Sequence, residues 1–230
     1  LLHEVLLRFH AAWGATDFSQ RDAAELAASL AEHAHAVLAP RLERAPALAA
    51  FARRLLGLIP GYIDWLRAHA AAGWRFAGGE RQCAQTLVLR DGRRIELVGR
   101  IDRIDARADG CVKVIDYKLR RGEVLRRALA EPGEDVQLPF YGLLLGSAAD
   151  LQAAYLSFER AKEDESGVRE IAPPQPFAAL VQAVGERLRT DLQRIADGAP
   201  LPALGAAAVC AYCEMRGLCR RDYWEHGPDA

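Results

Sequence analysis

The sequence predicts an α/β protein in which helices flank a mixed β-sheet. Three observations indicate this class. Residues 1–72 are rich in alanine and leucine and repeat apolar positions at helical spacing. From Gly73 onward, segments rich in β-branched residues alternate with Asp-Gly turn dipeptides. After residue 134, a helix-like, a strand-like and a second helix-like segment follow, an order typical of α/β folds.

We expect the chain to comprise three parts. Residues 1–72 form an N-terminal helical part, residues 73–198 the core, and residues 199–230 a Cys-rich tail. In the helical part, apolar positions from Leu2 to Trp13 predict a first helix, and Asp17 and Ser19 precede a second over residues 21–38. Three prolines are expected to interrupt the remainder: Pro40, Pro46 and Pro60.

The core is predicted to contain four strands and two helices. The strands are expected over residues 83–89, 94–106, 111–119 and 151–159. The first helix is expected over residues 134–145, with Pro139 in its first turn or at a kink, and the second within residues 174–196.

Composition excludes several classes of protein. The 230 residues are 51% hydrophobic and carry a formal net charge of -1, which excludes a disordered chain and a protein that coats nucleic acid through bulk positive charge. Arg53 and Arg54 interrupt the most apolar stretch, so it cannot span a membrane, and the N-terminus does not resemble a signal peptide.

No G-x-G-x-x-G or G-x-S-x-G motif is present, which disfavours a dinucleotide-binding enzyme and a serine hydrolase. We expect a cytoplasmic protein without a membrane partner, and, because no initiator Met is present, a piece of a longer chain.

The clearest chemistry lies in the segment GRIDRIDARADGCVKVIDYK. Alternation along a strand places Asp116 and Lys118 on one face, and places Arg100 and Asp102 together on the preceding strand. The Asp109-Gly110 turn pairs the two strands and brings Asp102 near Asp116. Two carboxylates suit Mg²⁺, and a lysine beside a metal-bound water can orient or deprotonate it, which points to phosphodiester hydrolysis. The alternative is a surface hairpin with a solvated Asp–Lys ion pair.

Five segments together resemble the PD-(D/E)xK nuclease superfamily, specifically its RecB/AddB-like branch. They are Leu-Leu-His3-Glu-Val-Leu, the GRIDRID segment from Gly99 to Asp105, Ile-Asp116-Tyr-Lys118, Gln137-Leu-Pro-Phe-Tyr141 and the glutamate Glu80. The resemblance extends from Leu1 to about Cys219. It implies a restriction-endonuclease-like core and a metal-dependent deoxyribonuclease.

The resemblance also implies roles for individual residues. The metal, Mg²⁺ or Mn²⁺, would be held by His3, Asp102, Asp116 and the backbone carbonyl of Tyr117. Lys118 would act on the water, and Glu80 would open the first core strand as a further catalytic carboxylate. Gln137 and Tyr141, four residues apart on a helix, would contact substrate or Lys118. Without the resemblance, a lone histidine such as His3 is more often a core residue, Glu80 an ordinary solvated carboxylate, and His33 and His35 structural or solvated.

The tail contains a second group of metal-ligand residues, Cys210, Cys213 and Cys219. Their C-x2-C-x5-C spacing favours a metal over disulfides in an intracellular protein, but the chain has no obvious fourth ligand. The resemblance implies a [4Fe–4S] cluster completed by a cysteine that precedes Leu1 in the intact protein. Zinc completed by His226, or three free thiols, are the alternatives. Cys83 and Cys111 are expected to be small buried hydrophobic residues.

A run of arginines follows the Asp-x-Lys motif: Arg120, Arg121, Arg126 and Arg127. These side chains could hold a DNA backbone without sequence preference, or form an ordinary solvated face. The resemblance implies an exonuclease or single-strand endonuclease of recombinational DNA repair, acting on a single strand or duplex end with a helicase domain or subunit. The alternatives are a catalytically inactive DNA-binding scaffold on the same fold and a zinc-binding interaction module.

Overall fold

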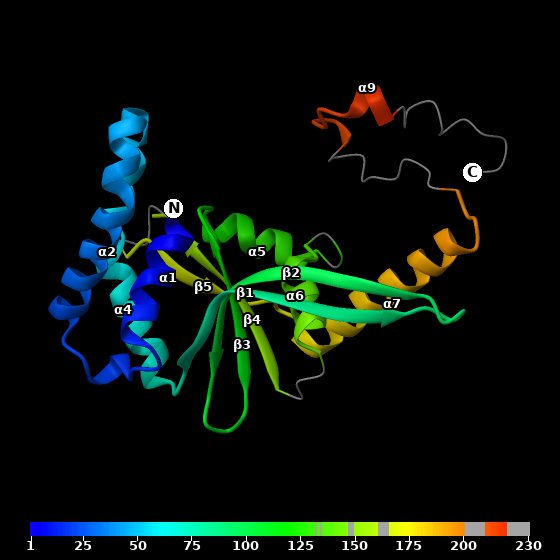
Figure 1. Cartoon of the computed structure of the whole chain (residues 1–230), viewed down its shortest axis with the longest axis horizontal. Coiled ribbons are helices and arrows are strands. Elements are labelled where there is room, and N and C mark those ends of the chain that lie inside the picture. The colour runs from blue at the N-terminus through cyan, green and yellow to red at the C-terminus, as the bar shows by residue number, and fades with distance from the viewer. Residues whose placement is uncertain (132, 134, 147–149, 161–165, 201–209, 220–230) are drawn as a thin grey trace.

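A five-stranded mixed sheet lies at the centre of the molecule, with helices packed on both faces (Figure 1). The computed structural model describes residues 1–131, 133, 135–146, 150–160, 166–200 and 210–219. The N-terminal helices are α1 (Leu2–Trp13), α2 (Ala23–Arg44), α3 (Ala49–Gly57) and α4 (Ile59–Ala71). The strands are β1 (Arg75–Val88), β2 (Arg94–Ala106), β3 (Val112–Lys118), β4 (Leu151–Phe158) and β5 (Val168–Ile171). The later helices are α5 (Gly122–Ala130), α6 (Gln137–Leu145), α7 (Phe177–Ala196) and the short α9 (Arg216–Cys219).

The strands follow one another in space in their sequence order, β1-β2-β3-β4-β5. Neighbouring strands are antiparallel except for β3 and β4, which run parallel because α5 and α6 carry the chain back across the sheet between them. Mixed pairing of this kind confirms the predicted α/β class. Within the described part of the chain, no helix combines the length and the apolar character that a membrane crossing requires.

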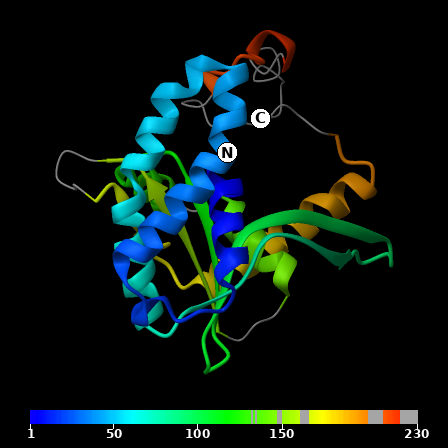
Figure 2. The same ribbon diagram turned by 60° about the vertical axis from the view of Figure 1, so that its left-hand side comes forward.

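Two apolar cores lie on opposite faces of the sheet, and β3 divides its residues between them. Ile115 and Tyr117 pack with the N-terminal helices, which cover one face (Figure 2). Val114 packs with α5, α6 and α7 on the other face. The alternation of a strand therefore sends Asp116, two residues from Val114, towards α6 rather than towards α1.

The β1–β2 hairpin extends beyond the segment in which β2 pairs with β3. β1 pairs with β2 from Arg75 to Val88, whereas the last pair between β2 and β3 is Arg103 with Ile115. The remainder of the hairpin, residues 81–101, is a two-stranded ribbon that runs beyond the sheet towards α7 (Figures 1 and 2). Leu87 and Leu97 are buried against the α6–α7 side, and Gly99 lets the ribbon approach α6 because an added Cβ would lie 2.6 Å from Leu144.

Most predicted elements are present, with several corrected bounds. β2 has the predicted bounds, whereas β1 begins at Arg75, so Glu80 lies inside this strand and does not open it. Pro40 does not interrupt α2, which continues to Arg44. Pro46 and Pro60 each lie in the first turn of a helical segment. β5 and α5, which have only four and nine residues, lie outside the predicted elements.

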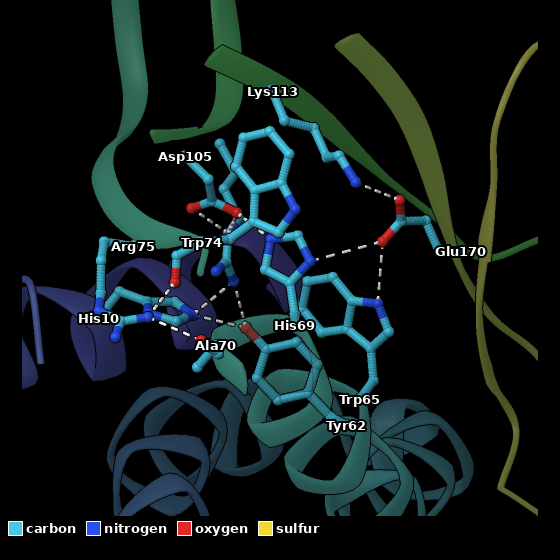
Figure 3. Close-up of polar contacts among 11 residues, drawn as sticks. His10, Tyr62, Trp65, His69, Ala70, Trp74, Arg75, Asp105, Lys113 and Glu170 are labelled. Atoms are coloured by element: carbon cyan, nitrogen blue, oxygen red, sulfur yellow. Dashed lines mark hydrogen bonds and ion pairs between the residues drawn. The ribbon is translucent and has the colours of Figure 1, made fainter. Parts of the chain in front are cut away.

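A buried polar network joins β2 to the N-terminal helices (Figure 3). Arg103 is only 1% exposed, and its guanidinium donates to both Asp105 oxygens at 2.9 and 2.8 Å, to the Tyr62 hydroxyl at 2.9 Å and to His10 Nε2 at 2.9 Å. Asp105 is also 2.8 Å from His69 on α4. Burial alone would lower the pKa of Arg103, but the Asp105 carboxylate outweighs it and raises that pKa. The network therefore holds β2 against α1 and α4 through charge-assisted hydrogen bonds, which are stronger than neutral ones.

His10 belongs to this network as a neutral imidazole. Its Nε2 accepts from Arg103, and the Tyr62 hydroxyl lies 2.5 Å from the same atom. Burial raises the pKa of Tyr62 to about 12, so the phenol keeps its proton. Burial first, and the nearby Arg103 charge second, lower the pKa of His10 well below its usual value.

This depressed pKa predicts that acid destabilises the fold. In the unfolded chain His10 binds a proton below about pH 6.5, whereas in the folded chain it does not. The free energy of unfolding should therefore fall as pH decreases below about 6.5, with His10 contributing up to about 1.4 kcal/mol per pH unit. Urea titrations at a series of pH values measure this slope.

His10→Gln should make the slope shallower whatever it does to absolute stability. His35→Gln is the control because His35 is exposed on α2. An unchanged slope in His10→Gln would contradict a neutral buried His10.

Candidate active site

The site is built where β2 and β3 separate. Beyond the pair Arg103–Ile115, β2 continues with β1 and β3 continues with β4, so Asp102 and Asp116 stand on strands that diverge. Asp102 Oδ2 accepts the backbone N–H of Tyr117 at 3.1 Å and satisfies a donor that strand pairing leaves open there. The Asp102 carboxylate is thereby fixed between the two strands.

Three side chains from separate segments meet around the other Asp102 oxygen. Nδ1 of His3, in the first turn of α1, lies 3.5 Å from Asp102 Oδ1 and 3.1 Å from Glu80 Oε1. The ligand atoms of His3, Glu80 and Asp102 all lie within 4.8 Å of one another, and we call these residues the acidic triad. Among the described residues, the acidic triad is the group of His, Cys, Asp and Glu side chains whose ligand atoms are close enough to share one metal ion.

The backbone around Glu80 brings its carboxylate into the triad. Glu80 has φ 48°, and among the described non-glycine residues it is the one with positive φ. The register of β1 against β2 shifts between Phe76 and Gly78, and a Cβ on Gly79 would lie 3.1 Å from Leu7 of α1. Gly79 therefore allows α1, and with it His3, to lie close to the strand. Arg100 fixes the carboxylate from the opposite side, with its Nε 2.9 Å from Glu80 Oε2.

A second cluster surrounds Asp116, which is 2% exposed, and we call it the Asp116 cluster. The Lys118 ammonium lies 2.8 Å from Asp116 Oδ2 and donates to Gln137 Oε1 at 2.6 Å. Gln137 and Tyr141, one turn apart on α6, both donate to Asp116 Oδ1, at 2.5 and 3.2 Å. No well-directed hydrogen bond reaches the buried Oδ2, although the ammonium is in contact with it.

The start of α6 is itself held in place. Asp135 Oδ1 accepts the backbone N–H of Gln137 at 3.2 Å and the hydroxyl of Tyr155 on β4 at 2.6 Å. The Lys118 ammonium lies 5.1 Å from the centre of the Tyr155 ring, a cation–π contact. Gln137 therefore connects Lys118 and Asp116 from a helix end that β4 positions.

Several charged groups of the site lie close enough to Asp102 to change its pKa. Burial, and then the nearby Asp116 charge, raise the pKa of Asp102 to about 6, against the opposing effect of His3. Burial and Asp116 likewise raise the pKa of Tyr141 well above its usual range, so its phenol acts as a neutral donor. Buried carboxylates this close to one another are stabilised by a cation between them, which is the arrangement that a divalent metal fits.

The structure assembles most of the predicted site residues in these two groups. His3 and Asp102 join Glu80, whereas Asp116 lies with Lys118, Gln137 and Tyr141. Tyr117 lies between the groups, with its ring edge-on to that of His3 at 5.6 Å. Arg100 was not predicted as a site residue, although alternation along β2 places it on the same face as Asp102.

The remaining predicted residues lie elsewhere. Arg120, Arg121, Arg126 and Arg127 are exposed after β3 and on α5, where Arg127 pairs with Glu123 at 3.4 Å. Cys210 is half-buried, Cys213 and Cys219 are exposed, and His226 lies outside the described residues. Cys111 is buried, as predicted, and donates to the carbonyl of Asp150 at 2.8 Å, while Cys83 is half-buried. His33 is half-buried and His35 exposed on α2.

Comparison with known proteins identifies the family. No curated protein sequence matches the chain. The solved structure titled "Crystal structure of SSO0001" matches with 18% sequence identity over 77% of this chain and 80% of that chain, with a TM-score of 0.37. The model of the PD-(D/E)XK nuclease superfamily matches residues 1–220, nearly the whole chain. The chain belongs to the PD-(D/E)XK nuclease superfamily.

Proposed function

We propose that the chain is a metal-dependent DNA nuclease domain of the RecB/AddB-like type, which hydrolyses phosphodiester bonds. The observation that carries the proposal is the acidic triad, which three distant segments assemble beside an Asp–Lys pair. Glu80 and Asp116 have Arg100 and Lys118 as partners, whereas the ion-pair partner of the buried Asp102 among the described residues is His3. Holding a third carboxylate beside these two is costly without a further cation, so the arrangement favours a metal site over a structural role. The presence of a complete set of catalytic residue types favours an enzyme over an inactive scaffold.

The donor atoms of the site fit a divalent ion. His3 Nδ1, Glu80 Oε1 and Asp102 Oδ1 would hold it, and the buried Asp116 Oδ2 is a further oxygen without a well-directed hydrogen bond. Carboxylate oxygens suit Mg²⁺, and the imidazole makes Mn²⁺ equally suitable. When bound, the ion would lower the pKa of a water and stabilise negative charge on the phosphate oxygens.

The Asp116 cluster would hold Lys118, the group that acts on the attacking water, beside the carboxylates. Lys118 is held from two sides by Asp116 and Gln137, so its ammonium keeps one position beside the carboxylates. From there it would orient the attacking water and stabilise the charge that develops on the phosphate. Tyr141 and the Gln137 amide would act through Asp116, because both donate to its Oδ1.

Further parts of the proposal rest on the resemblance in sequence. The nuclease would act on a single strand or duplex end in recombinational DNA repair, in the cytoplasm and together with a helicase domain or subunit. Residues 73–198 would form the nuclease core and residues 1–72 its helical part. The exposed Arg120, Arg121, Arg126 and Arg127 would contact the DNA backbone. Within the tail, residues 199–230, the three cysteines of the C-x2-C-x5-C motif would contribute to a [4Fe–4S] cluster in the intact protein.

Removing the lysine amine should abolish most cleavage. We expect Lys118→Met to reduce the cleavage rate of labelled DNA with Mn²⁺ by about 100-fold or more, because a positioned acid–base group contributes about 10²–10⁴-fold. Lys113→Met is the matched control, because Lys113 is on the same strand but faces Glu170 and the Trp74 ring. That control should lower thermal stability and keep cleavage. Equal cleavage rates for Lys118→Met and the unaltered protein would refute the assignment.

The acidic triad should determine metal affinity. Glu80→Gln and Asp102→Asn should each weaken Mn²⁺ binding by about tenfold or more, because each removes a charged ligand from an oxygen-rich site. Isothermal titration calorimetry on the full chain measures this affinity. Asp64→Asn, an exposed carboxylate on α4, is the control and should bind as the unaltered protein does. Unchanged affinity in both triad variants would place the metal elsewhere.

A further inference from the structure

One face of the β1–β2 ribbon is uncovered from the acidic triad to the hairpin end. On β2 this face carries Asp102, Arg100, Val98, Glu96 and Arg94, and on β1 it carries their opposite neighbours Glu80, Gln82, Ala84, Thr86 and Val88. Beyond the two triad carboxylates, every residue of this face is exposed. The other face is covered where Leu87, Leu97 and Ile101 are buried in the core that α6 and α7 share, although Arg81 and Gln85 on that face are exposed. We call the uncovered side the open face of the ribbon.

The ribbon is a locally basic part of a nearly neutral chain. Residues 81–100 contain five arginines and two acidic residues, whereas the whole chain has a formal net charge of -1. Two of the arginines, Arg94 and Arg100, stand on the open face near its two ends. The carboxylates of the triad would repel a polyanion, so positive charge directly beside them gives a phosphate backbone a favourable approach.

Between the two arginines the open face carries mixed side chains: Val98 and Ala84 are apolar, Gln82 and Thr86 are polar, and Glu96 is a carboxylate. Val98 is 61% exposed and stands opposite Ala84, and Val88 at the far end is 50% exposed. Alternation puts these side chains outward, and among the described residues nothing packs over them. Exposed apolar side chains beside two cations match a single nucleic acid strand, whose phosphates are anionic and whose unpaired bases offer apolar faces.

Arg100 connects this face to the acidic triad. Its Nε contacts Glu80 Oε2 at 2.9 Å, while the side chain is 64% exposed. Most of the guanidinium is therefore accessible from solvent, and a guanidinium binds phosphate oxygens in a bidentate manner. Arg100 can therefore orient the Glu80 carboxylate and hold a substrate phosphate at the same time.

From these observations we propose that the open face of the ribbon is the track along which a single nucleic acid strand reaches the acidic triad. Arg100 is the phosphate contact beside the metal site, and Arg94 is a contact near the hairpin end. The inference rests on the proposed function and extends it by assigning the path of the substrate. The track does not include the arginines on and before α5, a helix that contacts β4 and β5.

Binding without metal tests the track separately from catalysis. A fluorescein-labelled oligothymidylate long enough to span the ribbon is titrated with the full chain in EDTA at several salt concentrations. Arg94→Glu should weaken binding by about fivefold or more and reduce the slope of log affinity against log salt by about 0.7, the value for one lost phosphate contact to a single strand. Arg81→Glu makes the same charge change on the covered side of the ribbon and should have the smaller effect. Equal weakening by both variants would show that only net charge matters and would overturn the track.

Photo-crosslinking gives a second readout that does not depend on affinity. The photoreactive residue p-benzoylphenylalanine at Val98 should crosslink the labelled oligonucleotide, whereas the same residue at Gln85, exposed on the other side of the ribbon, should not. Crosslinking at Gln85 alone, or at neither position while the unaltered chain binds and cleaves DNA, would overturn the track and leave the nuclease function intact. A chain that neither binds the oligonucleotide nor cleaves DNA with Mn²⁺ would refute both.

Discussion

The hydrogen bond from the Tyr117 backbone N–H to Asp102 is the contact on which the rest of the site depends. It occurs where β2 and β3 stop pairing, so a carboxylate takes the place of a strand carbonyl. One oxygen of Asp102 is thereby used for structure, and the other is left to face His3 and Glu80. The same separation of strands frees the β1–β2 ribbon to run outward, while alternation along β3 sends Asp116 towards α6. The break in strand pairing thus places the acidic triad beside the Asp116 cluster and at the base of the ribbon.

Adjacent residues on β2 have different roles, one in the site and one in the buried polar network. Asp102 faces the site, while Arg103 turns to the other side and enters the network with Asp105, His10 and Tyr62. Because a strand alternates its side chains, a carboxylate that must stay in place can be supported by a buried ion pair directly behind it. The network ties β2 to α1, the helix that also carries His3, so the distance between His3 and Asp102 is set by packing rather than by the triad itself.

Much of this could be predicted from the sequence where short-range patterns determine it. The two Asp-Gly turns and the β-branched residues between them predict β2 and β3, and alternation then places Asp102, Asp116 and Lys118. Gln137 and Tyr141 lie one helical turn apart, and the structure puts both on Asp116. Strand and helix periodicity places these side chains on shared faces, whereas the site roles of Gln137 and Tyr141 are implied by the resemblance in sequence.

The position of Glu80 required information that local sequence does not contain. Its Gly-Gly-Glu segment does not resemble a strand, and its orientation depends on a positive φ, a register shift in β1 and the approach of α1. Arg103 and Asp105 are charged residues of the kind usually found on a surface, and only the tertiary packing of His10 and Tyr62 makes their burial favourable. β5 is too short for its four residues to form a recognisable pattern.

The location of a bound ion shows whether the acidic triad is a metal site. Anomalous diffraction from crystals of the full chain grown with Mn²⁺ gives that location without reference to activity. We expect an anomalous peak in coordination contact with His3 Nδ1, Glu80 Oε1 and Asp102 Oδ1, on the side of Asp102 away from the Tyr117 N–H. A peak at other residues, or none at the acidic triad under saturating Mn²⁺, would contradict this expectation.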